Sequence, residues 1–118
     1  MDNLATKEKK GIQATAIDIM KAAVIAAPGQ IVIKEIARPI PKRGEVLIKL
    51  EGSGVCASNI PIWQGRDWFS YPVAAGNPGH EGWGIIETLG PGVAGLSKGD
   101  RVAFLSNNAY AEFDIAKA

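Results

Sequence analysis

The stretch EVLIKLEGSGV, residues 45–55, indicates the fold class of this 118-residue chain. Val46, Ile48 and Leu50 alternate with charged neighbours, which is the two-residue period of a half-buried strand, and only Leu47 falls outside the pattern. Comparable runs rich in strand formers lie on both sides, separated by turn-forming residues. We therefore expect further strands at residues 20–26, 30–36, 82–90, 100–105 and 109–116, with a turn-rich loop, PGVAGLSKGD, at 91–100.

One segment, CASNIPIWQG at residues 56–65, interrupts the series of strands. Ser58 or Asn59 can cap a short helix, Pro61 is tolerated in its first turn, and Gly65 can end it. Many short antiparallel strands with one or two short helices favour a mainly β fold. We expect a partly open barrel rather than a parallel α/β sheet.

Composition and charge limit the domain count and the classes of partner. The length suits one domain, and 47% hydrophobic with 21% charged residues is typical of a folded protein. We interpret residues 1–18 as a polar extension and residues 19–118 as the domain. A net charge of +1 argues against nucleic acid, and no apolar run is long enough for a membrane span. With one cysteine and no secretory signal, we expect a reducing cytoplasm.

Chemically active residues are few. Cys56 follows the strand at 45–55, and His80, the only histidine, comes 24 positions later in the stretch GHEG. Thiolate and imidazole are preferred zinc ligands, and a catalytic zinc takes three protein ligands, for which the adjacent Glu81 is the remaining candidate. The alternatives stay open: a buried thiol, a hydrogen-bonded histidine, a solvated carboxylate at Glu81 and a helix cap at Ser58.

Four aromatic residues lie close to these positions. They are Trp63, Trp68, Phe69 and Trp83. Such residues can line an apolar substrate pocket or fill the inside of a small barrel, and the sequence does not favour either role.

Five stretches in a fixed order resemble a known family: MKAAV, PKRGEVLIKLEGSGVCASN, GHEGWGIIETLGPGV, GDRVAF and YAEF. From Met20 to about Ala116 the chain resembles the amino-terminal GroES-like catalytic domain of the medium-chain dehydrogenase/reductase superfamily, in its zinc-dependent alcohol dehydrogenase group. The resemblance implies a GroES-like, partly open barrel.

The resemblance also implies roles for individual residues. Cys56 and His80 match the first two ligands of a catalytic zinc, and Glu81 matches the adjacent acid that can approach the metal. Ser58 matches the hydroxyl that hydrogen-bonds a substrate alcohol and passes on its proton. We expect Gly79 and Gly82 to leave room for loop backbone around His80. The implied reaction interconverts an alcohol and a carbonyl compound with NAD(P).

Several positions depart from the family pattern. Asn59 replaces an aspartate that orients the ligand histidine, although its amide oxygen can accept the same hydrogen bond. Pro61 replaces a histidine of the proton relay, so Ser58 would release its proton to water, and Ala57 replaces an arginine that contacts the cofactor. The family's four-cysteine lobe is missing between GDRVAF and YAEF, which excludes a structural zinc.

The third zinc ligand and the nucleotide-binding domain of the family come later in the chain than residue 118. We therefore expect a fragment of a longer oxidoreductase that is inactive alone, whose NAD(P) would be bound by the missing domain. Homo-oligomerisation of the full-length protein stays open. Two alternatives remain: a zinc-free quinone or enoyl reductase of the same superfamily, and a free-standing GroES-like binding module without enzyme activity.

Overall fold

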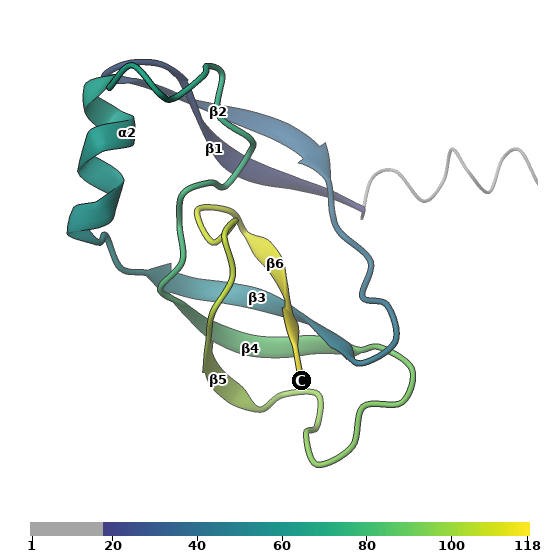
Figure 1. Cartoon of the computed structure of the whole chain (residues 1–118). Coiled ribbons are helices and arrows are strands. Elements are labelled where there is room, and N and C mark those ends of the chain that lie inside the picture. The colour runs from purple at the N-terminus through teal and green to yellow at the C-terminus, as the bar shows by residue number, and fades with distance from the viewer. Residues whose placement is uncertain (1–17) are drawn as a thin grey trace, which may run out of the picture.

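A computed structural model describes residues 18–118 (Figure 1). The predicted polar extension, residues 1–18, lies outside the described residues except for Asp18. Two antiparallel sheets make up the fold: a hairpin of β1 and β2, and a four-stranded sheet in the order β5-β4-β3-β6. The predicted mainly β fold is confirmed, and its sheets do not close into a continuous barrel.

The hairpin consists of β1 (Ile19–Ala27) and β2 (Gln30–Ala37). Its tight turn uses Gly29 at a φ of 71°, a backbone conformation that glycine adopts without steric cost. β1 buries alternate residues against the rest of the domain, whereas β2 is exposed along nearly its whole length. The hairpin therefore stands at the outside of the fold, attached through β1 (Figure 1).

The four-stranded sheet is built around β3 (Glu45–Ser53), which pairs with β4 (Gly82–Leu89) on one side and β6 (Phe113–Lys117) on the other. The short β5 (Arg101–Phe104) continues the sheet beyond β4. The last strand begins at Phe113 and not near residue 109 as expected. The preceding residues leave the sheet, because Ala111 pairs with Ala22 of β1 as an isolated bridge.

β3 is buried on both faces in its first half, so the prediction of a half-buried strand with Leu47 off pattern was incomplete. Val46 and Ile48 pack with Ile86 in one hydrophobic cluster. Leu47 points to the opposite face and packs with Met20 and Phe113, where β1 crosses the sheet. A strand between two layers buries consecutive residues, and this explains why Leu47 breaks the alternation.

The helical segment lies where the sequence predicts it, as a 3₁₀ turn (Ala57–Asn59) followed by α2 (Ile60–Gln64). Pro61 lies in the first turn of α2, and Gly65 ends it with a φ of 83°. Asn59 occupies the N-cap position, but its side chain forms no cap bond there, and its amide nitrogen donates to Tyr110. No helix among the described residues has the length and apolar character needed to cross a bilayer.

Candidate metal site

Antiparallel pairing of β3 with β4 brings Cys56 and His80 together. The last paired residue of β3, Ser53, lies opposite Gly82, the first residue of β4. The next backbone bond runs from the N–H of Gly54 to the carbonyl of Glu81, at 2.9 Å. Cys56 follows the end of one strand and His80 precedes the start of the other, so both reach the same end of the sheet.

Three ligand atoms gather at this end of the sheet. One atom each from Cys56, His80 and Glu81 lies within 4.8 Å of the other two. Nε2 of His80 is 3.9 Å from Oε2 of Glu81. Although His80 and Glu81 are adjacent in sequence, both side chains reach this site.

The spacing and chemistry of this set fit a zinc ion. Zinc–sulfur bonds of about 2.3 Å and zinc–nitrogen bonds of about 2.0 Å place tetrahedral ligand atoms about 3.3–3.6 Å apart. The His80–Glu81 separation is only slightly longer than this range, and all three ligand atoms lie within 4.8 Å of one another. Thiolate, imidazole and carboxylate are all zinc ligands, and three of them leave one position open.

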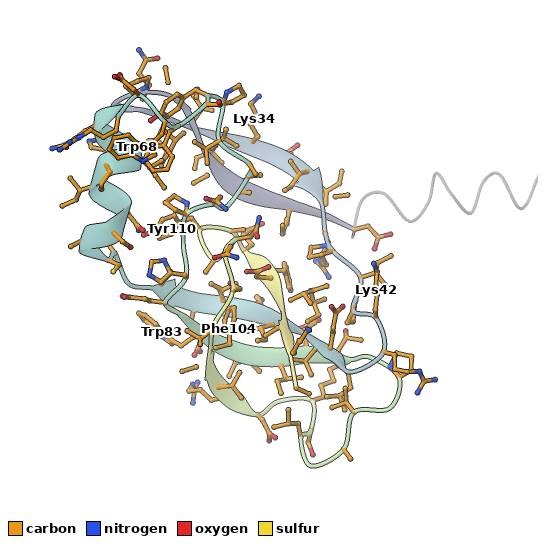
Figure 2. All side chains as sticks on the ribbon, viewed as in Figure 1. Lys34, Lys42, Trp68, Trp83, Phe104 and Tyr110 are labelled. Atoms are coloured by element: carbon orange, nitrogen blue, oxygen red, sulfur yellow. The ribbon has the colours of Figure 1, made fainter. Side chains whose placement is uncertain are left out.

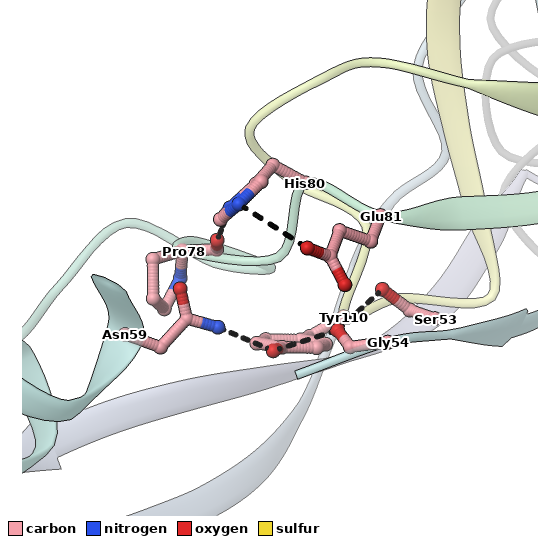
Figure 3. A network of polar contacts seen from close by, with 7 residues as sticks. All are labelled: Ser53, Gly54, Asn59, Pro78, His80, Glu81 and Tyr110. Carbon is pink, nitrogen blue, oxygen red and sulfur yellow. Dashed lines mark hydrogen bonds and ion pairs between the residues drawn. The ribbon is translucent and has the colours of Figure 1, made fainter. Parts of the chain in front are cut away.

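The carbonyl of Pro78 fixes the orientation of the His80 ring. Nδ1 of His80 lies 3.0 Å from this oxygen, which leaves Nε2 directed toward Glu81 (Figure 3). A ligand histidine usually bonds a carbonyl or carboxylate through its other nitrogen. The Asn59 amide oxygen, which could have accepted this bond, has no hydrogen-bond partner, and the backbone carbonyl of Pro78 is the acceptor.

Hydrogen bonds inside the site shift two pKa values in opposite directions. The pKa of the Cys56 thiol is lowered most by the Ser58 hydroxyl. The Ser58 backbone N–H and His80 lower it further, with smaller effects. The hydrogen bond to the Pro78 carbonyl, followed by the bond to Cys56, raises the pKa of His80. The site therefore favours a thiolate, which is the form of cysteine that binds metal.

The side chain of Asn59 belongs to a polar network beside the ligands. Its amide nitrogen donates to the hydroxyl of Tyr110 at 2.6 Å, and that hydroxyl donates to the carbonyl of Gly54 at 3.1 Å (Figure 3). Asn59 is buried, and its Oδ1 has no hydrogen-bond partner. Desolvation raises the pKa of Tyr110, so its hydroxyl remains a donor.

An apolar groove of about 1100 Å³ borders this network. Asn59, Pro78 and Tyr110 contribute to its wall, but the candidate ligands Cys56, His80 and Glu81 do not. The groove therefore lies next to the site without containing the ligand atoms. The apolar side chains that line it include Ile31, Ile33, Val55, Ile60 and Trp63.

The four aromatic residues do not fill the inside of a barrel. Trp63 lines the groove, and Trp68, 70% exposed, stacks at a tilt on Phe69 with ring centroids 5.8 Å apart. Trp83 is also exposed and covers Gly52, where a Cβ atom would come within 2.2 Å of its ring. Of these four residues, only Trp63 lines the groove and is placed to contact a groove ligand.

Residues 42–114 match the family model of the alcohol dehydrogenase GroES-like domain. The chain belongs to this family. An alcohol dehydrogenase from Moraxella sp. (strain TAE123) is 43% identical over 84 residues, which cover 70% of this chain and 25% of that protein. The chain thus spans about a quarter of the length of this curated relative.

Solved structures of both zinc-containing and quinone-reducing proteins share the fold of this GroES-like domain. A cobalt- and zinc-bound thermostable alcohol dehydrogenase from Pyrobaculum aerophilum matches with a TM-score of 0.69 and 26% identity, over 84% of this chain and 39% of that one. A mycobacterial quinone oxidoreductase matches with a TM-score of 0.66 and 34% identity, over 83% and 31%. The predicted resemblance is confirmed.

Gly79 and Gly82 leave room around His80 in this GroES-like domain, as expected. The groups that occupy this room belong mainly to Tyr110 and Phe104. A Cβ atom on Gly79 would lie 2.7 Å from the backbone nitrogen of Tyr110 and 2.9 Å from its ring. A Cβ atom on Gly82 would lie 2.8 Å from the ring of Phe104. Gly79 therefore allows the segment before β4 to pack against Tyr110, and Gly82 allows the start of β4 to pack against Phe104 at the end of β5.

Three glycines of the GroES-like domain have the spacing of a nucleotide-binding motif, but the structure around them differs from that motif. Gly90, Gly92 and Gly95 follow β4 with the spacing G-x-G-x-x-G. In the structure they belong to the turns between β4 and β5, and no helix follows them before β5. A pyrophosphate site of this type needs the amino terminus of such a helix, so these glycines form a loop.

Tyr110 is the residue at this site that sequence reasoning missed. It was noted only as the first residue of the stretch YAEF, although its hydroxyl is bonded to both Asn59 and Gly54. The only available signal was a tyrosine in a stretch that the family resemblance already included. Its contacts are 51 and 56 positions away along the chain, so no local pattern could reveal them.

Proposed function

We propose that this chain is the metal-binding and substrate-binding domain of a zinc-dependent NAD(P) oxidoreductase that interconverts an alcohol and a carbonyl compound. One observation carries the proposal: Cys56, His80 and Glu81 present ligand atoms within 4.8 Å of one another. Membership of the alcohol dehydrogenase GroES-like family supports the same reaction class.

Cys56, His80 and Glu81 would hold the metal, with Glu81 as the third ligand in place of one from a later segment. The bond from Nδ1 to the Pro78 carbonyl leaves Nε2 of His80 unprotonated for this role. Bound zinc would act as a Lewis acid that lowers the pKa of an alcohol in its open position. The carboxylate of Glu81 packs closely on Gly54, where a Cβ atom would lie 2.5 Å from Oε1, and a side chain at position 54 would displace it.

Ser58 is our candidate for accepting the substrate proton. Its hydroxyl is the main cause of the lowered pKa of Cys56, which places it close to the thiol, and the residue is exposed on the 3₁₀ turn. An exposed serine can pass a proton directly to water. This route suits a chain that has Pro61 where a relay histidine is expected.

The substrate would be a small molecule with an apolar part. Val55 and Ile60 flank the Cys56 turn, are exposed, and line the groove beside the site together with Trp63. Apolar walls with few polar groups are typical of small-molecule sites. Oxidation of an alcohol also needs a hydride acceptor, and we assign NAD(P) to a part of the protein outside this chain. This chain alone is therefore proposed to be inactive.

A metal-free reductase of the same superfamily is the second candidate. The match to the mycobacterial quinone oxidoreductase, at 34% identity, favours it. In that case Cys56 and His80 would be retained without a metal. The two candidates differ in metal content, while a free-standing binding module would show neither turnover nor bound zinc. Cytoplasmic location remains a prediction, and homo-oligomerisation stays open.

The test uses the protein isolated from its native source. We expect an intact mass well above the 12.4 kDa of this chain, one zinc ion at this site, and alcohol oxidation coupled to NAD⁺ or NADP⁺ reduction. Replacing Cys56 with Ala should remove both the zinc and the turnover, whereas Ser97→Ala, an exposed change between β4 and β5, should remove neither. Quinone reduction without zinc would support the second candidate, and a native mass near 12.4 kDa would overturn the dehydrogenase proposal.

A further inference from the structure

We infer that Tyr110 is a positioning residue that holds the two ligand-bearing loops of the candidate metal site against each other. The inference rests on the proposed metal site but concerns a residue outside the ligand set. Tyr110 lies between the hairpin and the four-stranded sheet, in the middle of the molecule (Figure 2).

The hydroxyl of Tyr110 bridges the loop that carries Cys56. Asn59 donates to this hydroxyl at 2.6 Å, and the hydroxyl donates to the carbonyl of Gly54 at 3.1 Å. Gly54 precedes Cys56 by two residues and Asn59 follows it by three. One hydroxyl group therefore ties together both ends of the turn that presents the thiol.

The backbone and ring of Tyr110 hold the second loop, which carries His80. The N–H of Tyr110 donates to the carbonyl of Gly76 at 3.1 Å, and the N–H of Ala109 donates to the carbonyl of Gly79 at 3.0 Å. The ring lies directly on Gly79, where a Cβ atom would come within 2.9 Å of it. The residue before His80 is therefore packed against Tyr110.

A third contact anchors Tyr110 to the core. Its carbonyl accepts a bond of 2.8 Å from the N–H of Ala23 in β1, and Ala22 of the same strand is buried and bridged to Ala111. Tyr110 thus connects a fixed strand with two loops that are 24 residues apart at their ligands.

Removing only the Tyr110 hydroxyl separates its contact with the Cys56 loop from its contacts with the His80 loop and β1. Phenylalanine keeps the ring on Gly79 and all backbone bonds, but it leaves the Asn59 amide and the Gly54 carbonyl without their shared partner. Asn59 is already buried with an unpartnered Oδ1, so its side chain would lose its remaining bond. A buried donor without a partner is costly, and the Cys56 turn is expected to shift to relieve it.

Tyr71 offers a matched control in the same chain. It is the only other tyrosine, and its hydroxyl donates to the carbonyl of Ile62, away from the ligand set. Both substitutions therefore remove one phenolic hydroxyl. Tyr110→Phe takes its hydrogen bonds from the Cys56 loop, whereas Tyr71→Phe takes one from Ile62.

The test titrates the 118-residue chain with Co²⁺ and follows the cobalt–thiolate absorption band together with the visible bands of tetrahedral cobalt. We expect Tyr110→Phe to bind Co²⁺ about 10–100-fold more weakly, which is the usual effect of losing a hydrogen-bonding group that orients metal ligands. The visible bands of the bound cobalt should also change. Tyr71→Phe should match the wild type. Thermal unfolding of the metal-free proteins checks that both variants fold.

The outcomes separate this inference from the proposal on which it rests. If the wild type gives no thiolate band, the metal site itself fails and the inference fails with it. If the wild type binds and Tyr110→Phe binds equally well with identical bands, the metal site stands and the role of Tyr110 is overturned. Should Tyr110→Phe not fold, Asn59→Ala removes the same link from the other side, and unchanged cobalt affinity there would overturn the inference.

Discussion

Nδ1 of His80 lies 3.0 Å from the carbonyl oxygen of Pro78, two residues earlier in the chain. A carbonyl oxygen only accepts hydrogen bonds, so the neutral imidazole must carry its proton on Nδ1. The free Nε2 then faces Glu81 at 3.9 Å. The backbone of one tight loop therefore sets which ring nitrogen is available to a ligand.

This relationship predicts the tautomer of His80 in the metal-free chain. Above the raised pKa of His80, we expect the Nδ1–H form, whereas free histidine favours Nε2–H. Because His80 is the only histidine, nitrogen-15 correlation spectra of the imidazole report on it without overlap. Observation of the Nε2–H form would show that the Pro78 bond is absent in solution.

Ser58 is predicted to control the reactivity of the single thiol. Its hydroxyl is the main cause of the lowered pKa of Cys56, so Ser58→Ala should raise that pKa. The thiolate is the reactive form, and the pH profile of iodoacetamide alkylation in the presence of a chelator should move to higher pH. Ser53→Ala is the control, because the Ser53 hydroxyl bonds the Gly54 carbonyl instead. Equal profiles for the two variants would contradict the prediction.

The exposed ion pair between Glu51 and Arg101 predicts a pH-dependent contribution to stability. Arg101 donates to both oxygens of Glu51, at 2.9 and 3.1 Å, and this hydrogen bonding lowers the pKa of Glu51. A lowered folded-state pKa stabilises the fold above the unfolded-state value, and the contribution is lost as pH falls through the folded-state value.

Urea unfolding of the wild type and Glu51→Gln checks this contribution. The wild type should be slightly more stable near neutral pH, and the difference should disappear well below pH 4.5 and shrink in high salt. Glu35→Gln, an exposed change on β2, serves as the control. A difference that persists unchanged in acid would rule out the carboxylate as its cause.

Two isoleucines should differ sharply in their contribution to stability. Ile48 of β3 is 0% exposed, and its truncation to alanine should lower the free energy of unfolding by about 2–5 kcal/mol. Ile33 of β2 is 64% exposed, so the same truncation should change it by no more than about 0.5 kcal/mol. Chemical denaturation of both variants measures the two values, and similar losses would contradict the burial pattern.

The strand pattern was predictable because turn formers and alternating apolar residues are local signals. They located β1 to β5 closely, and Pro61 with Gly65 bounded α2. The second buried face of β3 was not predictable, since the crossing of β1 over Leu47 depends on tertiary packing. The late start of β6 has the same origin, because Ala111 pairs with β1 instead.

At the candidate site, the sequence identified residue types but not their connections. Cys56, His80 and Glu81 stand out because few other residues can hold zinc, and the pairing of β3 with β4 brings them together. Asn59 was the possible acceptor for His80 that the sequence offered, since a side-chain oxygen is visible in sequence and the backbone carbonyl of Pro78 is not. The true partner of Asn59, Tyr110, comes from a loop 51 residues away.

Zinc binding to the 118-residue chain tests the central claim most directly. After equilibrium dialysis against low zinc, we predict one zinc ion per wild-type chain, and greatly reduced zinc in Cys56→Ala and His80→Ala while Ser53→Ala keeps it. Zinc retained equally by all four proteins, or absent from the wild type, would contradict the assignment of Cys56, His80 and Glu81 as a metal site.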